Sequence, residues 1–154
     1  SKGCQLHAFE PVPHTFKVLE ENLHYYDGPN LHLNNCGLSE KKGTVDFYIK
    51  QSCASNSYVN NIDYTDIIQC QIITLDEYVK RNRINQVDFI KADIEGAERD
   101  MLLGASEVIK KFKPKLSICT YHLPDDPQVI EDIIKKYSND YTIIHKWKKI
   151  YAYV

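Results

Sequence analysis

Predicted strands and helices alternate along most of this chain, and that alternation is the feature that most restricts its fold. Short apolar runs that favour strands lie at residues 6–9, 31–36, 87–92 and 116–121. Apolar residues at helical spacing follow three of these runs, starting at Pro13, Ala97 and Asp126. The second of these patterns predicts one helix over residues 97–112. This order predicts an α/β fold with a mostly parallel sheet and helices on both of its faces.

Two antiparallel elements are expected beside the parallel strands. Over about residues 43–73, two β-favouring runs flank the polar loop 52–66, which indicates an antiparallel insertion. The last two strands, at residues 141–147 and 150–154, are joined by a link too short for anything but a hairpin. We expect residues 1–154 to form a single domain around one core.

Composition excludes several classes of protein. The chain is 43 % hydrophobic and 26 % charged with a net charge of −2, so it lacks the basic excess that favours nucleic acid. No apolar run is long enough to span a membrane. The five cysteines are widely spaced without a CxxC pair, which is typical of reduced, mostly buried thiols in a cytoplasmic protein. No two cysteines or histidines have the spacing of zinc ligands, so no metal site is expected.

The stretch KADIEGAERD places acids where a buried strand ends and a helix begins. Ligands of parallel α/β sheets bind beyond the carboxyl ends of the strands, so Asp93 and Glu95 are candidates for a site. A helix cap and a solvated loop acid are the structural alternatives for these two. Gly96 allows the chain to turn. Glu98 is expected to serve the helix through its dipole, and Arg99 to lie on a solvated face.

His122 directly follows the strand at residues 116–121 and lies at the same edge of the predicted sheet. Histidine side chains titrate near neutral pH, so this residue could act as a general base toward a hydroxyl group. A loop histidine without a catalytic role fits the pattern equally well. Hard divalent cations bind carboxylate oxygens, so acids crowded at one strand edge leave a cation open as a further alternative.

Four stretches of the sequence, AFEPVPHTF, NNCGLSEKKGTVDFY, ITLDEYV and VDFIKADIEGAERDMLLGA, together resemble the FkbM family of S-adenosylmethionine-dependent methyltransferases. The resemblance runs from about Leu6 to Val154, and KADIEGAE followed by LLGA is its most specific part. It implies a Rossmann-like class I methyltransferase sheet. It also implies methylation of a hydroxyl group on a small molecule or sugar, with S-adenosylmethionine as the methyl donor.

The resemblance assigns roles to particular residues. Glu10 matches the acid that holds the ribose hydroxyls of the cofactor, a role that suits a carboxylate facing a vicinal diol. Asn35 and Cys36 match the region that lines the adenine. Asp93 and Glu95 match the acidic motif beside the methyl-transfer centre, and Asp93 is assigned to cofactor contact as well.

One departure from the family pattern affects cofactor binding. Sheets of this type place a glycine-rich turn about 20 residues before the ribose acid, but only nine residues precede Glu10. The first strand and its glycine loop are therefore expected to be missing, which predicts weak or absent cofactor binding by this chain. Acceptor specificity is assigned to the loop 52–66 and to segments beyond the chain.

Two other functions stay open at this point. A degenerate, non-catalytic methyltransferase-like module would use the sheet edge left by the missing strand for interaction, and a homodimer is one such outcome. A nucleotide-sugar or dinucleotide enzyme on a similar sheet shares the ribose acid, but does not explain KADIEGAE.

Overall fold

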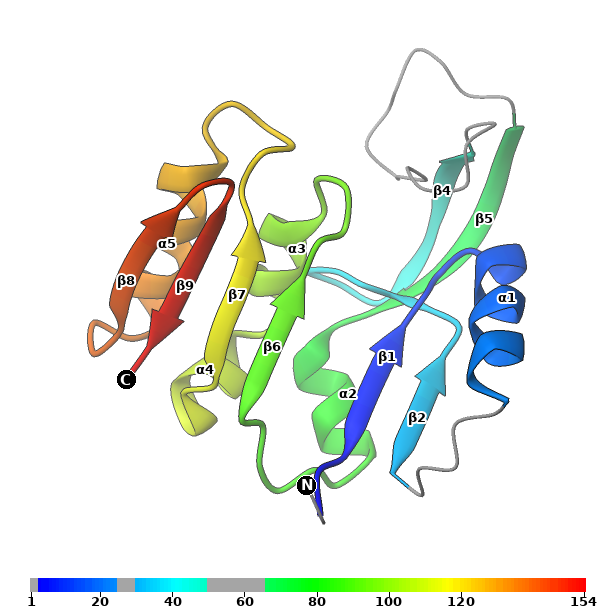
Figure 1. Cartoon of the computed structure of the whole chain (residues 1–154), viewed down its shortest axis with the longest axis horizontal. Coiled ribbons are helices and arrows are strands. Elements are labelled where there is room, and N and C mark those ends of the chain that lie inside the picture. Colours follow the sequence, from blue (N-terminus) through cyan, green and yellow to red (C-terminus); the bar gives the residue numbers. More distant parts are fainter. Residues whose placement is uncertain (1–2, 25–29, 50–65) are drawn as a thin grey trace. The chain divides into compact units, whose positions relative to one another are not determined.

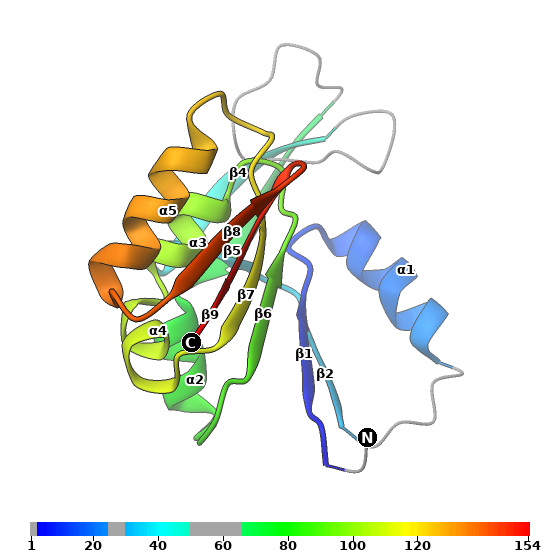
Figure 2. The same ribbon diagram turned by 60° about the vertical axis from the view of Figure 1, so that its left-hand side comes forward.

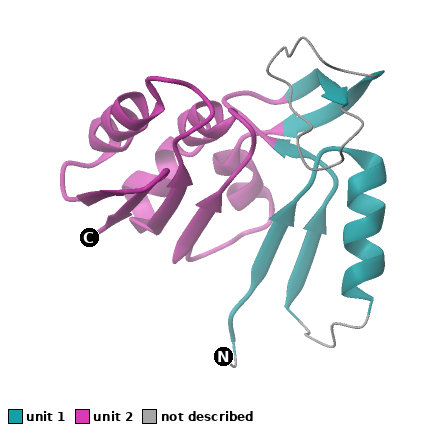
Figure 3. Ribbon diagram, turned by 45° about the horizontal axis from the view of Figure 1, so that its top comes forward, with its two compact units in different colours: residues 1–37, 43–72 teal, residues 38–42, 73–154 magenta. Residues whose placement is uncertain are grey.

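The computed structural model describes most of the chain as two compact units (Figure 3). The described residues are 3–24, 30–49 and 66–154. The first unit comprises residues 1–37 and 43–72, and the second comprises residues 38–42 and 73–154. The predicted acceptor loop at residues 52–66 lies outside the described residues except for its last residue.

The first unit contains a strand–helix–strand segment (Figure 1). Strand β1 (Leu6–Phe9) and strand β2 (Leu31–Asn34) pair in parallel, with Leu6 opposite Leu31. Helix α1 (Pro13–Leu23) connects them and begins at the predicted proline, whose fixed φ and missing N–H suit a first helical turn. Parallel strands need such a crossover, so the local sequence pattern accounts for this arrangement.

A three-stranded sheet follows in the chain. Strands β3 (Gly37–Leu38), β4 (Gly43–Ile49) and β5 (Asp66–Ile73) are ordered β3-β5-β4, and β4 and β5 run antiparallel with Gly43 opposite Ile72. Their apolar side chains form a small core with the residue before α1. This core consists of Val12, Phe47 and Cys70, with Val45, Ile49 and Ile68 packed against it.

A four-stranded mixed sheet organises the second unit. Its strands are β6 (Phe89–Ala92), β7 (Lys115–Cys119), β8 (Thr142–Lys146) and β9 (Lys149–Tyr153), in the order β6-β7-β9-β8. The β6–β7 pair is parallel, whereas β9 runs antiparallel to both β7 and β8. The predicted C-terminal hairpin is therefore confirmed.

Four helices belong to the second unit: α2 (Leu75–Arg81), α3 (Glu98–Leu103), α4 (Ser106–Phe112) and α5 (Asp126–Tyr137). Helices α3, α4 and α5 lie on one face of its sheet (Figures 1 and 2). These helices and the strands β7 and β9 contribute a fully buried apolar core. It consists of Met101, Leu102, Ile109, Leu116, Ile118, Ile130, Ile134 and Ile150. The expectation of helices on both faces concerns one sheet that includes strands of both units, so it stays a prediction.

The expectation of one continuous helix over residues 97–112 is wrong, because the helix is interrupted between α3, which ends at Leu103, and α4, which begins at Ser106. Gly104 lies against the backbone of Ser39, and a Cβ atom on this glycine would stand 2.0 Å from the Ser39 carbonyl oxygen. The Asp76 carboxylate then accepts hydrogen bonds of 2.9 and 3.0 Å from backbone N–H groups in the first turn of α4. These contacts come from distant segments, so the helical periodicity alone does not reveal the break.

The cysteines and helices bear on two further expectations. Among the four cysteines that the structure describes, Cys70 and Cys119 are buried, Cys36 is partly buried and Cys4 is exposed. The prediction of mostly buried thiols thus holds for two of these four. No described helix combines the length and the apolar character that crossing a lipid bilayer requires.

Candidate functional site

A tight turn follows β6 and begins the candidate site. Glu95 and Gly96 have φ angles of 57° and 99°, in the left-handed region that glycine adopts freely and other residues adopt at a cost. The prediction that Gly96 allows the chain to turn is confirmed. Backbone strain at a residue such as Glu95 persists only where surrounding contacts enforce it, and such residues cluster at functional sites.

The Glu98 carboxylate supplies those contacts. Its two oxygens accept hydrogen bonds from the backbone N–H groups of Ile94 (2.8 Å) and Gly96 (3.0 Å), and its side chain is only 1 % exposed. Burial raises the pKa of Glu98, although the hydrogen bonds from Ile94 and Gly96 oppose that change. Glu98 lies in the first turn of α3, where the sequence places it, and its carboxylate also stabilises the turn before that helix.

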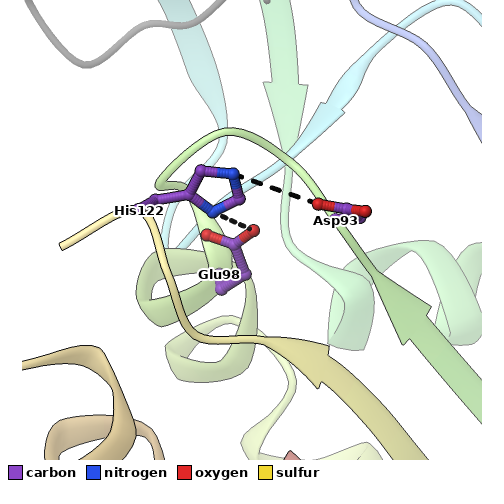
Figure 4. Close-up of side chains that lie close together, drawn as sticks. All are labelled: Asp93, Glu98 and His122. Carbon is purple, nitrogen blue, oxygen red and sulfur yellow. Dashed lines mark ion pairs between the residues drawn. The ribbon is translucent and has the colours of Figure 1, made fainter. Parts of the chain in front are cut away.

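His122 lies beside this turn, just after β7 (Figure 4). Its Nδ1 atom is 3.1 Å from Glu98 Oε1, and its Nε2 atom is 3.6 Å from Glu95 Oε2 and 3.9 Å from Asp93 Oδ1. The structure therefore brings together Asp93, Glu95 and His122, the three residues proposed for catalysis from the sequence. Because β6 and β7 are parallel neighbours, their carboxyl ends deliver these side chains to one edge of the sheet.

Asp93 is held by donors from β7 and the residues after it. The Tyr121 hydroxyl donates a 2.9 Å hydrogen bond to Asp93 Oδ1. Partial burial favours the protonated acid, but hydrogen bonds from the Cys119 thiol and the Tyr121 hydroxyl outweigh it and lower the pKa of Asp93. The same hydrogen bond raises the pKa of Tyr121 to about 12. Helix α3 has no side-chain cap among the described residues, so the structure does not support the helix-cap alternative for Asp93.

Arg99 connects α3 to the segment that carries His122, and its expected solvated position is wrong. Its Nε atom donates to Asp126 Oδ1 at 2.6 Å, and its terminal nitrogen donates to Asp125 Oδ1 at 2.5 Å. The second oxygen of Asp126 accepts from the Leu123 N–H at 2.8 Å. Sequence reasoning missed this connection; its only signal was the adjacent pair of aspartates before the proline that opens α5.

The residues assigned to the cofactor's nucleoside lie in the first unit. Glu10 follows β1, and its Oε1 atom accepts a 2.8 Å hydrogen bond from the Val12 N–H. Burial raises the pKa of Glu10 despite this bond. Asn35 donates to the backbone oxygens of Glu10 (2.8 Å) and Pro11 (3.2 Å), so it joins the ends of β2 and β1. Cys36 is partly buried next to it in the sequence.

A metal ion could be held in the second unit, although no ligand spacing in the sequence indicated one. One carboxylate oxygen each from Asp93 and Glu98 and one ring nitrogen of His122 all lie within 4.8 Å of one another. These ligands come from three segments, which is why no local motif joins them.

Comparison with known proteins gives consistent matches. The family model described as Methyltransferase FkbM domain matches residues 1–141. The chain is 25 % identical to the Hexuronic acid methyltransferase AglP of Haloferax volcanii, covering 88 % of this chain and 55 % of that protein. It is 24 % identical to the 2-O-methyltransferase NoeI of Sinorhizobium fredii, covering 71 % of this chain and 51 % of that protein. The chain thus spans about half the length of these relatives.

The fold comparison points the same way. The crystal structure of Methyltransferase FkbM from Methylobacillus flagellatus superposes with a TM-score of 0.70, covering 97 % of this chain and 36 % of that one. The two sequences are 24 % identical, so this likeness concerns the α/β fold alone.

Proposed function

The chain belongs to the methyltransferase FkbM domain family, and on this premise we propose that it is part of an S-adenosylmethionine-dependent O-methyltransferase. The proposed acceptor is a hydroxyl group on a small molecule or sugar. The names of two relatives support this class, because one is a hexuronic acid methyltransferase and the other a 2-O-methyltransferase. The observation that carries the proposal is the meeting of Asp93, Glu95 and His122 at the carboxyl ends of β6 and β7.

The proposal includes the finer architecture of the family. Residues 1–154 then form one methyltransferase domain with a Rossmann-like class I sheet, and the antiparallel strands at about residues 43–73 are an insertion in it. The first strand of that sheet and its glycine-rich loop are not among these residues. Likeness to a solved methyltransferase along 97 % of the chain supports this architecture, as do the two parallel strand pairs.

The first unit supplies residues that fit the nucleoside part of S-adenosylmethionine. Glu10 places a partly buried carboxylate directly after a parallel strand, and a carboxylate accepts hydrogen bonds from both hydroxyls of a ribose. Asn35 and Cys36 follow the neighbouring strand and are assigned to the adenine. Asn35 also fixes the backbone at Glu10 through its amide nitrogen. When bound, S-adenosylmethionine supplies an electrophilic methyl group on a sulfonium sulfur.

The second unit supplies the groups for the acceptor. Bound S-adenosylmethionine would give its methyl group to the acceptor oxygen and leave as S-adenosylhomocysteine, and the hydroxyl proton would pass to a base of this unit. Asp93, Glu95 and His122 are the groups we assign to orienting the hydroxyl and accepting its proton. Asp93 has a lowered pKa, so at neutral pH it is a carboxylate that accepts hydrogen bonds. We assign it to orientation and to cofactor contact.

Methyl transfer by the full-length protein tests the function directly. We expect transfer of a labelled methyl group from S-adenosylmethionine to hexuronic acids or related hydroxyl compounds, detected by mass spectrometry. Asp93→Asn should lower turnover by about a hundredfold or more, the usual scale for a positioned catalytic group. The matched control is Asp132→Asn, an exposed acid on α5, which should leave turnover unchanged. Unchanged turnover in Asp93→Asn would remove that residue from the site.

The non-catalytic module is not favoured, because the matched relatives are named as methyltransferases. It remains testable through its own expectations, which are no methyl transfer and a stable homodimer on size-exclusion chromatography. Weak cofactor binding by the 154-residue chain is a separate expectation. Micromolar affinity for S-adenosylhomocysteine in calorimetry would refute it.

A further inference from the structure

We propose that Asp93, Glu98 and His122 bind a divalent transition-metal cation at the carboxyl ends of β6 and β7. One atom from each residue lies within 4.8 Å of the other two. The residues come from the turn after β6, the first position of α3 and the segment after β7, and their side chains converge (Figure 4).

The spacing of the side chains suits a common cation. Ligand atoms bound to one metal ion at about 2.0–2.2 Å stand roughly 3–4.4 Å apart, depending on the angle between them. His122 Nδ1 lies 3.1 Å from a Glu98 oxygen and Nε2 lies 3.9 Å from an Asp93 oxygen, but one ion takes only one of these ring nitrogens. With one ligand atom taken from each residue, all three atoms lie within 4.8 Å of one another, close to that range. Small side-chain rotations therefore suffice to direct three ligands at one point.

His122 supplies an independent indication of a missing partner. Its side chain is only 9 % exposed, yet neither ring nitrogen has a hydrogen-bond partner within the part of the chain that the structure describes. The approach of Nδ1 to Glu98 is close, but the atoms are not aligned as in a hydrogen bond. Buried polar groups without partners are rare and costly. A cation bound to one ring nitrogen would supply a partner.

The two carboxylates are oriented by other donors, as ligands of metal sites usually are. The Tyr121 hydroxyl binds Asp93, and two backbone N–H groups of the turn bind Glu98. Each carboxylate oxygen has more than one lone pair, so these hydrogen bonds leave room for a metal bond. Two carboxylates also balance the charge of a divalent ion. The Glu98 side chain is only 1 % exposed, so little water solvates its charge and a nearby cation would stabilise it.

The donor set indicates the kind of cation. Calcium and magnesium prefer oxygen ligands throughout, whereas an imidazole nitrogen with carboxylates suits manganese, iron or zinc. Three protein ligands leave positions that an acceptor hydroxyl could occupy, and a metal-bound hydroxyl loses its proton more easily. This catalytic use rests on the proposed methyl transfer, but cation binding itself does not.

Manganese binding can be measured without cofactor or acceptor. The chain is titrated with MnCl₂ while electron paramagnetic resonance follows the free ion, and ZnCl₂ is added as a competitor. We expect one saturable site, displaced by zinc, with affinity reduced about tenfold or more in Asp93→Asn and in His122→Gln. The matched control is His145→Ala, because His145 pairs with Glu131 on the surface at 2.6 Å, and this variant should bind normally. Circular dichroism confirms that each variant is folded.

The outcomes separate this site from the methyl-transfer proposal. No saturable binding of manganese or zinc, or equal binding in folded Asp93→Asn and His122→Gln, would overturn the site. Equally tight binding of MgCl₂ at these residues would overturn the assignment to a transition metal. If the site binds manganese but the full-length protein transfers methyl groups at an unchanged rate after chelation, the catalytic use fails. Manganese binding in a protein that transfers no methyl group supports the site and contradicts the proposed function alone.

Discussion

The pairing of Arg99 with Asp126 offers a sharp test of how the second unit holds its candidate site. The Asp126 side chain is 1 % exposed and the Arg99 side chain is 21 % exposed, with 2.6 Å between Nε and Oδ1. The other Asp126 oxygen accepts the Leu123 N–H, which lies one residue beyond His122. Replacing Arg99 by alanine therefore leaves a buried carboxylate with a single neutral donor.

The expected loss follows from that burial. Removing one partner of a buried ion pair costs about 3–5 kcal/mol, because the remaining charge is desolvated and uncompensated. Water reaches part of Arg99, so we expect the lower end of this range, about 3 kcal/mol. The matched control is Asp125→Ala, which removes the other ion pair of the same arginine. Asp125 is 65 % exposed, so its loss should cost no more than about 1 kcal/mol.

Urea unfolding followed by circular dichroism measures both variants against the unmodified chain. A double-mutant cycle with Asp126→Ala then isolates the Arg99–Asp126 interaction, because the double variant no longer contains a buried unpaired charge. We expect the double variant to be no less stable than Arg99→Ala. Equal free energies of unfolding for Arg99→Ala and Asp125→Ala would refute the reasoning. Loss of the buried Asp126 pair would then cost no more stability than loss of the exposed Asp125 pair.

Two further predictions concern stability. Gly104→Ala should destabilise the chain by about 3 kcal/mol in urea, because its Cβ would meet the Ser39 oxygen at 2.0 Å, whereas Gly43→Ala, with open space around it, serves as control. Equal losses in the two variants would contradict this. Tyr141 is buried and donates to the Pro114 oxygen, and burial raises its pKa to about 12. The folded state thus keeps a proton that the unfolded chain loses near pH 10, so the free energy of unfolding is highest below about pH 10 and falls toward pH 12, by up to about 3 kcal/mol. Tyr141→Phe should show a shallower fall over this range, and an identical pH profile would exclude the assignment.

Local sequence patterns predict most of the second unit's elements. Thr74 and Glu77 have the spacing of a helix cap, and the Thr74 hydroxyl accepts the Glu77 N–H at 3.0 Å at the start of α2. The short link before the last strand forces a hairpin, and the structure contains one. The break at Gly104 was not predictable, because its cause is the Ser39 backbone and the cap supplied by Asp76. Periodicity describes one segment at a time and carries no information about which distant backbone approaches it.

The candidate site also contains features that the sequence predicts and features that it does not. Asp93, Glu95 and His122 were predictable as neighbours, because parallel strands deliver their carboxyl ends to one edge. The role of Arg99 was not, since its aspartate partner is 27 residues away and a lone charge after an acidic motif is usually solvated. The burial of Glu98 was equally hidden. Its position in a first helical turn explains an acid there, but not a carboxylate directed back at the preceding turn.

The two adjacent residues that open α3 have complementary effects on the site. Glu98 holds the strained turn after β6, and Arg99 holds the segment after β7 through Asp126. Both sides of the cluster around His122 thus depend on one helical turn, so stability and site geometry should change together. Arg99→Ala provides the discriminating case, because the hydrogen bonds described for Arg99 go to Asp125 and Asp126 and not to a proposed cation ligand. If positioning through α3 is correct, this variant should weaken manganese binding under conditions where it is still folded, while Asp125→Ala should not.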